Sequence, residues 1–273
     1  MIPYYAEPAL HLGPVEIGAF RFTLVAAVVL GGAIMIRRAC RFKMSGHLMF
    51  SVSRWAIACG LIGAHVAKMT MDYTSMFLAD PAVLVTTSRG IRSIGGLAGG
   101  LIGAVICCKL RRVPWSETFR MLDIMAFAMP FAFAAGRLGC FLVHDHRGLP
   151  SNSWIAVQFP DGPRFDLGLI ECLFLIPVSA LFLLLDRKPR RAGFFVGVYG
   201  MLYGGFRIWL DTLHIQPMRF YEGSALVLMG VLALIAMRSY SISMQRMTAI
   251  DSSRVHVPNA GVHAPRVISS MPG

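Results

Sequence analysis

Residues 17–36 read IGAFRFTLVAAVVLGGAIMI, an apolar run in which Arg21 is the only charged side chain. An α-helix rises about 1.5 Å per residue, so about 20 apolar residues cross the roughly 30 Å hydrocarbon core of a bilayer. The run is therefore long enough and apolar enough to be a transmembrane helix. Similar apolar blocks recur along most of the 273-residue chain.

These blocks predict seven membrane spans. Their bounds are Ile17–Ile36, Met49–Met69, Ile91–Cys108, Met121–Val143, Leu167–Leu185, Ala192–Leu210 and Tyr221–Met237. We therefore expect an all-α integral membrane protein, with a seven-transmembrane-helix bundle in residues 1–237. Residues 238–273 mix Ser, Pro, His and Arg without apolar periodicity, which predicts a disordered basic cytoplasmic tail.

The composition excludes a soluble globular protein, because 56% of the residues are hydrophobic and only 15% are charged. The net charge of +12 could indicate a nucleic-acid-binding protein, so the position of the basic residues decides between these classes. They concentrate in three short segments: Arg37, Arg38, Arg41 and Lys43; Lys109, Arg111, Arg112 and Arg120; Arg187, Lys188, Arg190 and Arg191. Cytoplasmic loops are rich in Lys and Arg, so the pattern predicts no nucleic-acid partner, an N-terminus outside and a cytoplasmic C-terminus.

Charged side chains inside the expected spans are costly, by about 2.5–3.5 kcal/mol each, unless they have a partner or a wet cavity. Cations such as Arg137 and Arg207 outnumber carboxylates near the expected outer half of the bundle. A buried guanidinium favours a phosphate through paired hydrogen bonds, so an anionic phospholipid is the expected partner. The alternative is an ion pair within the membrane, such as Arg207 with Glu171 or Asp211.

The densest polar feature is residues 136–148, GRLGCFLVHDHRG, at the end of the fourth expected span. A histidine beside an aspartate can act as a general base, which makes His144, Asp145 and His146 candidate catalytic residues. They could instead be two metal ligands and a carboxylate, but a third ligand is not obvious, so we expect no metal and no cofactor. A solvated polar loop is a further alternative. Cys140 could be a nucleophile, although we favour a packing role.

Glycines recur at helical spacing in two of the expected spans. They are Gly95, Gly99 and Gly103 in the third span and Gly193, Gly197, Gly200 and Gly204 in the sixth. A helix face without side chains lets two backbones approach closely. We therefore expect these glycines to pack helices rather than to contact a ligand directly.

The run Gly136-Arg137-Leu138-Gly139-x-Phe141, followed by Asp145 and Gly148, resembles the signature of the prolipoprotein diacylglyceryl transferase family. Further matches lie along most of the chain. They are Gly13-Pro14-Val15, Arg37-Arg38-Ala39, Asp80-Pro81, Gly95-Gly96-Leu97 with Gly99, Glu171, and Tyr203-Gly204-Gly205-Phe206-Arg207. Several separately placed matches are more specific than one motif.

The resemblance implies a multi-pass enzyme of the bacterial inner membrane. Such an enzyme transfers a diacylglyceryl group from phosphatidylglycerol to the lipobox cysteine thiol of a prolipoprotein, releasing glycerol phosphate at the outer face. The implied partners are phosphatidylglycerol, or a related anionic phospholipid, and the prolipoprotein signal peptide. Arg137 and Arg207 are implied to hold the headgroup phosphate and to stabilise the charge that develops on the leaving group, Arg207 as a catalytic residue and Arg137 as a substrate-binding residue. The other implied substrate-binding residues are Gly95, Gly96, Gly139, Cys140, Gly148 and Glu171.

The chain departs from the family pattern at several positions. Ile94 stands where the family has a histidine, and Phe20 where it has a tyrosine. Cys140 replaces the signature asparagine, and Asp145 replaces its glutamate. We therefore hypothesise that the base has relocated to residues 144–146. The alternative is a catalytically inactive relative that acts as a phospholipid-binding membrane protein or a transporter.

Reporter fusions test the expected orientation. Fusions near Arg41, Arg111 and Lys188 should report the cytoplasm, because the basic loops stay on that side. An alkaline phosphatase fused at Gly148 should be active, since this loop is expected outside. An inactive phosphatase at Gly148 would overturn both the orientation and the placement of the site.

Overall fold

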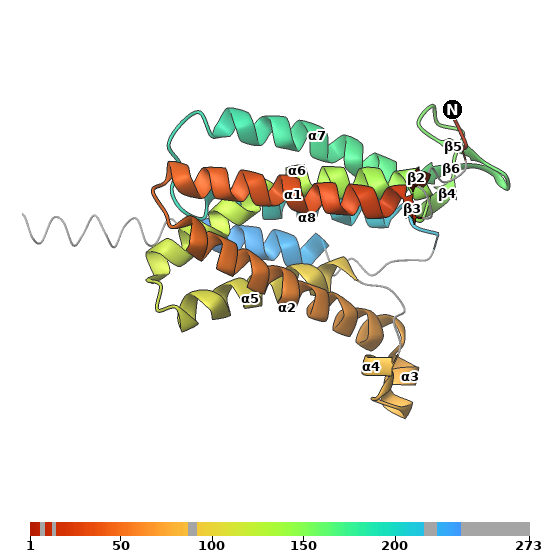
Figure 1. Ribbon diagram of the computed structural model, residues 1–273. Coiled ribbons are helices and arrows are strands. Elements are labelled where there is room, and N and C mark those ends of the chain that lie inside the picture. Colours follow the sequence, from red (N-terminus) through yellow and green to blue (C-terminus); the bar gives the residue numbers. More distant parts are fainter. Residues whose placement is uncertain (6–8, 13–14, 87–91, 216–222, 236–273) are drawn as a thin grey trace, which may run out of the picture.

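The computed structural model describes residues 1–5, 9–12, 15–86, 92–215 and 223–235 and consists mainly of helices (Figure 1). They are α1 (Ala19–Arg41), α2 (Gly46–Asp72), α3 (Thr74–Ala79), α4 (Val83–Thr86), α5 (Ser93–Leu110), α6 (Trp115–Val143), α7 (Leu167–Leu185) and α8 (Phe194–Asp211). A shorter apolar helix occupies Gly223–Ile235. The long helix α6 contacts α1, α7 and α8, whereas α2 packs mainly on α5. The expectation of a mainly helical protein is confirmed.

Five helices in the described part of the chain are long and apolar enough to cross a membrane: α1, α2, α5, α6 and α7. They coincide with the first five expected spans. In α8, Arg207, Asp211 and several glycines and tyrosines reduce the apolar character of the sixth expected span. The helix Gly223–Ile235 is shorter than the seventh expected span. The total of seven spans is therefore not confirmed, and the ends of the seventh span and the tail 238–273 lie outside the described residues.

Many large apolar side chains are exposed along these helices, as contact with lipid requires. Val25 and Val29 of α1 and Leu183 of α7 are each more than half exposed. A soluble monomer rarely exposes so much apolar surface. The surface therefore supports a multi-pass membrane protein.

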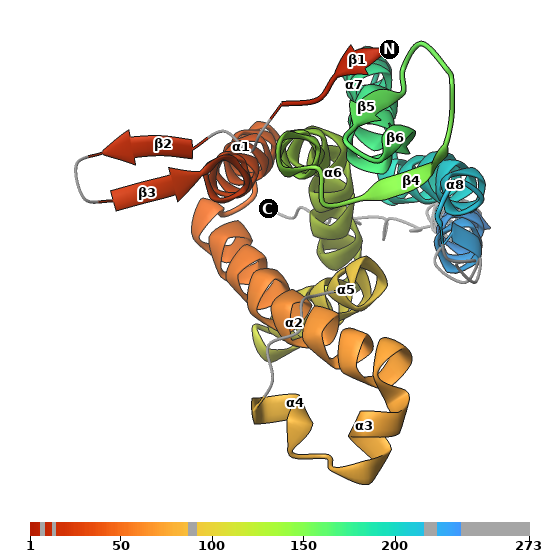
Figure 2. The ribbon, with the colours of Figure 1, turned by 90° about the vertical axis from the view of Figure 1, so that its right-hand side faces the viewer.

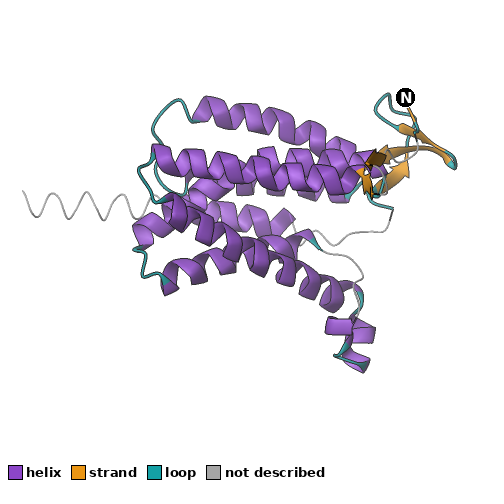
Figure 3. Cartoon of the chain, viewed as in Figure 1, coloured by secondary structure: helices purple, strands orange, loops and turns teal. Residues whose placement is uncertain are grey.

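Two small sheets gather at one end of the helices, a feature that the sequence analysis did not predict (Figure 3). The strands β1 (Ile2–Pro3), β5 (Val157–Phe159), β6 (Gly162–Asp166) and β4 (Arg147–Pro150) form one sheet in that order. The strands β2 (Ala9–Leu12) and β3 (Val15–Gly18) form a hairpin that projects from the start of α1 (Figure 2). Strands this short contain too few residues for apolar alternation to be recognised.

The helices α2 and α5 approach closely because glycines line their contact. A Cβ atom added to Gly99 would overlap the carbonyl oxygen of Cys59 in α2, and Gly95 faces Gly63 of α2 in the same way. The absence of side chains lets the two backbones touch. The packing role expected for the third-span glycines is confirmed.

The glycines of α8 divide into two groups. A Cβ atom on Gly200 would lie 2.8 Å from the Cα atom of Gly230, and Gly197 and Gly204 also pack on the helix Gly223–Ile235. Gly193 instead precedes α8 with a φ of 93°, a left-handed conformation that favours glycine. Gly193 is thus a turn residue, not a packing residue of the helix face.

The ends of the helices opposite to the sheets are held by two buried contacts. Arg38 of α1 forms a 2.7 Å ion pair with Asp186, and its guanidinium lies 3.8 Å from the ring centroid of Phe127. Asp123 of α6 accepts a 2.7 Å hydrogen bond from the N–H of Phe195 and so caps the start of α8. These contacts fix α1, α7 and α8 around α6.

Replacing Gly99 by Ala should destabilise the protein by about 1–3 kcal/mol, because the added methyl group forces α2 and α5 apart. The measurement is the midpoint of thermal unfolding in detergent. Gly32→Ala in α1 is the matched control, since nothing lies within 4 Å of its added Cβ atom. Equal midpoints for both variants would contradict close packing of α2 on α5.

Candidate functional site

Three helices contribute to one buried cluster of charged side chains around Glu171 of α7. The Nε atom of Arg137 in α6 lies 2.9 Å from Oε1 of Glu171. The Nη1 atom of Arg207 in α8 lies 3.4 Å from Oε2, and the hydroxyl of Tyr203 donates a 2.6 Å hydrogen bond to Oε1. Both expected phosphate-binding arginines thus meet at one carboxylate. The ion pair proposed as the alternative for Arg207 is present.

The cluster continues along α8 toward the sheet. The Nε atom of Arg207 lies 3.2 Å from Oδ1 of Asp211, and Nδ1 of His214 lies 3.9 Å from the same oxygen. Burial, together with the nearby Arg207 charge, lowers the pKa of His214 to about 4, so this imidazole is neutral at pH 7. Gly148 of β4 pairs with His214 in an isolated bridge. The cluster therefore extends to the end of the molecule that carries the sheet.

Burial makes this pairing necessary. Glu171 is 1% exposed and Arg207 is 7% exposed. An unpaired charge at such a position would be strongly destabilising, whereas paired and hydrogen-bonded charges are tolerated. A guanidinium carries five N–H donors and can serve a carboxylate and a second anion together. The arrangement can therefore receive a phosphate.

A tight reversal leads from this cluster to the sheet. His144, directly after α6, has a left-handed backbone conformation with a φ of 52°. Its N–H bonds to the carbonyl oxygen of Phe141 at 3.2 Å, and the N–H of Asp145 bonds to that of Cys140 at 3.4 Å. These bonds satisfy carbonyls at the helix end. They also bring Asp145 back beside the last turn of α6.

The two histidines of the loop have different partners. The Nδ1 atom of His144 lies 2.8 Å from Oδ2 of Asp166, the last residue of β6. Asp166 also accepts a 3.1 Å hydrogen bond from the N–H of Leu169 and so caps α7. Burial raises the pKa of Asp166, although its hydrogen bonds act in the opposite direction. Asp166, rather than Asp145, is thus the carboxylate that contacts His144.

His144 is enclosed by aromatic rings. Its Nε2 atom is buried and has no hydrogen-bond partner among the described residues. The ring centroids of Tyr4, Tyr5, Phe141 and Phe159 lie 5.0, 5.1, 5.5 and 5.3 Å from that of His144. The enclosure ties the first residues of the chain to the end of α6. We therefore interpret His144 and Asp166 as a buried structural pair.

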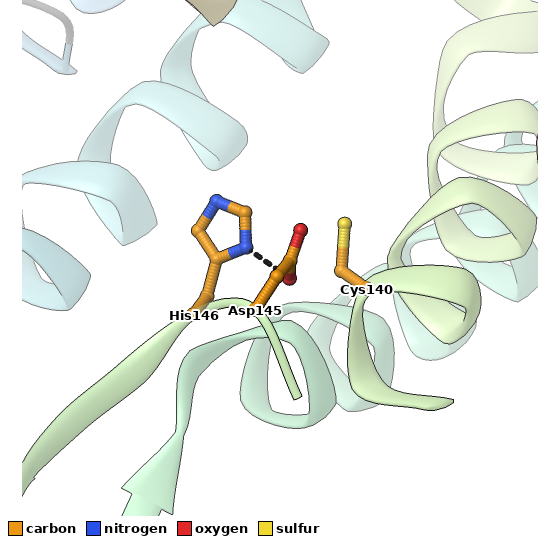
Figure 4. A group of neighbouring side chains, drawn as sticks. All are labelled: Cys140, Asp145 and His146. Carbon is orange, nitrogen blue, oxygen red and sulfur yellow. Dashed lines mark hydrogen bonds and ion pairs between the residues drawn. The ribbon is translucent and has the colours of Figure 1, made fainter. Parts of the chain in front are cut away.

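His146, in contrast, pairs with Asp145, and both side chains lie next to Cys140. Figure 4 shows the three side chains together, with Asp145 between the other two. Hydrogen bonds to Asp145 and to Cys140 raise the pKa of His146 to about 9. The Nη1 atom of Arg137 donates to the sulfur of Cys140 at 3.9 Å. This group therefore adjoins the Arg137–Glu171 pair.

The glycines of the expected site lie at contacts between elements. A Cβ atom on Gly139 would overlap Thr23 of α1, and one on Gly148 would lie 2.9 Å from the carbonyl oxygen of Leu213. Gly95 packs on α2, and Gly96 lies beside it in α5.

Sequence reasoning missed two functional neighbours, Asp166 and His214. An acidic residue directly before the apolar run Leu167–Leu185 is a helix-start signal that could have identified the cap at Asp166. Its contact with His144 spans 22 residues of sequence and depends on the pairing of β4 with β6. His214 lies three residues after Asp211, so helical spacing could have indicated that contact, whereas its bridge to Gly148 depends on the tertiary structure.

Comparisons with known proteins identify the family of the chain. A model of the prolipoprotein diacylglyceryl transferase family matches residues 7–247. The phosphatidylglycerol–prolipoprotein diacylglyceryl transferase of Frankia alni is 28% identical over 259 residues, 87% of this chain and 67% of that protein. The proteins of the same name from Nostoc sp. and Trichormus variabilis are 26% and 25% identical, covering 81% and 78% of this chain and 87% and 82% of their own length. The chain belongs to the prolipoprotein diacylglyceryl transferase family.

Proposed function

We propose that the protein transfers a diacylglyceryl group from phosphatidylglycerol to a cysteine thiol of a prolipoprotein. The thiol sulfur attacks the glyceryl carbon that is bound to the phosphate oxygen. A C–S bond forms, the C–O bond breaks, and glycerol phosphate leaves with the electron pair. Membership of the family and the apolar helices support this activity.

One observation carries the proposal: Arg137 and Arg207, from α6 and α8, both contact the buried carboxylate of Glu171. Glu171 and Tyr203 hold the two guanidiniums in place before a lipid arrives. A phosphate that enters then meets donors that need little reorganisation, and the charge that develops on the leaving group is stabilised. Glu171 is thus a positioning residue for the two arginines.

The acceptor thiol needs a group that favours its thiolate form, because the thiolate is the nucleophile. The base hypothesis named His144, Asp145 and His146. Of these, His144 is enclosed by aromatic rings, whereas Asp145 and His146 are 39% and 40% exposed in their side chains. We assign thiol activation to Asp145 and His146. Both lie beside Cys140, and the sulfur of Cys140 contacts Arg137.

We place the site at the outer face of the bacterial inner membrane. The basic segments that follow α1, α5 and α7 lie at the opposite end of the helices from the sheets (Figure 1). The positive-inside rule assigns that end to the cytoplasm. The thiol of a prolipoprotein signal peptide and the phospholipid would then meet beside β4 and the end of α6.

Complementation tests the proposed function. Expression of the full chain in a transferase-depleted bacterium should restore growth, and mass analysis of a reporter lipoprotein should show a diacylglyceryl group on its N-terminal cysteine. A chain that reaches the membrane but leaves the reporter unmodified would exclude this activity on that acceptor. Such a result would favour the inactive phospholipid-binding alternative.

Arg137→Lys should reduce lipidation of the reporter at least about tenfold, which corresponds to about 1.4 kcal/mol. Lysine keeps the charge but loses the planar pair of donors. Arg207→Lys should behave similarly. Arg54→Lys is the matched control, because Arg54 is exposed on α2 and contacts Phe50 rather than the cluster.

The comparison requires equal amounts of each variant in the membrane. Parent-like lipidation by Arg137→Lys would mean that Arg137 has only a structural role. A loss in Arg54→Lys of the same size would mean that the assay responds to any change of a helix arginine.

A further inference from the structure

Cys140, Asp145 and His146 form a group of potential metal ligands at the edge of the arginine cluster. One ligand atom from each, a sulfur, a carboxylate oxygen and a ring nitrogen, lies within 4.8 Å of the others (Figure 4). Thiolate, carboxylate and imidazole are the ligand types that zinc binds in proteins. The third ligand that was not evident in the sequence is thus Cys140.

The backbone brings these side chains together. The left-handed residue His144 reverses the chain, and the N–H of Asp145 bonds to the carbonyl oxygen of Cys140. Cys140 is 7% exposed, whereas Asp145 and His146 lie at the surface of the loop. The group is therefore anchored on a helix on one side and accessible on the other.

We propose that Cys140, Asp145 and His146 bind one zinc ion and leave its fourth coordination position open for the acceptor thiol. The role of the open position in binding the acceptor thiol rests on the proposed transferase activity. Tetrahedral ligands at about 2.0–2.3 Å from zinc lie roughly 3.3–3.8 Å apart. The most widely separated of the three atoms must therefore close by about 1 Å, while the hydrogen-bonded atoms of Asp145 and His146 must move apart. Zinc then replaces the hydrogen bond between His146 and Asp145.

The local charges are compatible with a divalent cation. A thiolate at Cys140 and the Asp145 carboxylate together balance the two positive charges of zinc once the ion has displaced the proton that His146, with a pKa of about 9, carries at neutral pH. The neighbouring cations Arg137 and Arg207 are compensated by Glu171 and by Asp211. A cation-lined surface would repel zinc, but here each guanidinium already contacts a carboxylate.

An open position at zinc would supply the group that activates the acceptor thiol. A thiol that coordinates zinc loses its proton, here to water. The sulfur then forms the C–S bond with the glyceryl carbon, the C–O bond breaks, and the electron pair leaves on glycerol phosphate. Arg137 lies 3.9 Å from the Cys140 sulfur, so the phosphate site and the thiol site adjoin.

Cobalt binding tests the site independently of catalysis. The full chain, purified in detergent and stripped with chelator, is titrated with Co²⁺ without lipid or acceptor. We expect one equivalent to bind with a thiolate-to-cobalt charge-transfer band and to be displaced by Zn²⁺. No stoichiometric binding by the folded parent, or binding without that band, would overturn the metal site.

Variants identify the ligands. Cys140→Ser should abolish the charge-transfer band, and Asp145→Asn or His146→Ala should weaken cobalt binding at least about tenfold. Cys40→Ser and His47→Ala are matched controls, because these residues lie near the α1–α2 turn at the opposite end. Parent-like spectra from Cys140→Ser would exclude this ligand set, and the parent's own band reports a thiolate even if that variant fails to fold.

A last measurement separates this inference from the proposed function. Adding a short cysteine-containing peptide to the cobalt-loaded protein should intensify the charge-transfer band, and the matching serine peptide should not. Cobalt binding without a response to the thiol would overturn the open position but keep the metal site. A chain that binds cobalt and fails in complementation would refute the transferase activity, not the site.

Discussion

The buried carboxylate of Glu171 is the constraint on which the rest of the site depends. A carboxylate that is 1% exposed needs several partners, and Arg137, Tyr203 and Arg207 supply them from two other helices. The same contacts that make the charge tolerable set the distance between the two arginines. The proposed recognition of a phosphate would therefore use the same atoms that stabilise the bundle.

The sheet end of the molecule serves the site in a different way. The pairing of β4 with β6 places Asp166 beside His144, and this pair anchors the loop on α7. With His144 held inside, only Asp145 and His146 face the last turn of α6. The short strands thus decide that His144 contacts Asp166, whereas its neighbour His146 contacts Asp145.

Tight packing between helices holds the elements that carry the site in place. Glycine contacts join α2 to α5 and α8 to the helix Gly223–Ile235, while Asp123 caps α8 from α6.

Position 140, where the chain departs from the family pattern, has neighbours that only the structure shows. A cysteine that is only a replacement in the sequence lies beside Asp145, His146 and Arg137 in space.

The sequence alone determined that the chain is a helical membrane protein with apolar spans, basic loops at one end and a transferase-family signature, because hydropathy, loop charge and motifs are local properties. It also identified Arg137, Glu171 and Arg207 as residues that must find partners in the membrane. Only the tertiary structure decided the rest: that one carboxylate holds both arginines, that His144 pairs with Asp166, and that Cys140 joins Asp145 and His146. Those contacts depend on which helices pack together, on an abrupt reversal after α6 and on strands of two to five residues. Glycine spacing can mark a helix face that packs, but no local pattern names its partner, and the reversal and the short strands leave no periodic signal.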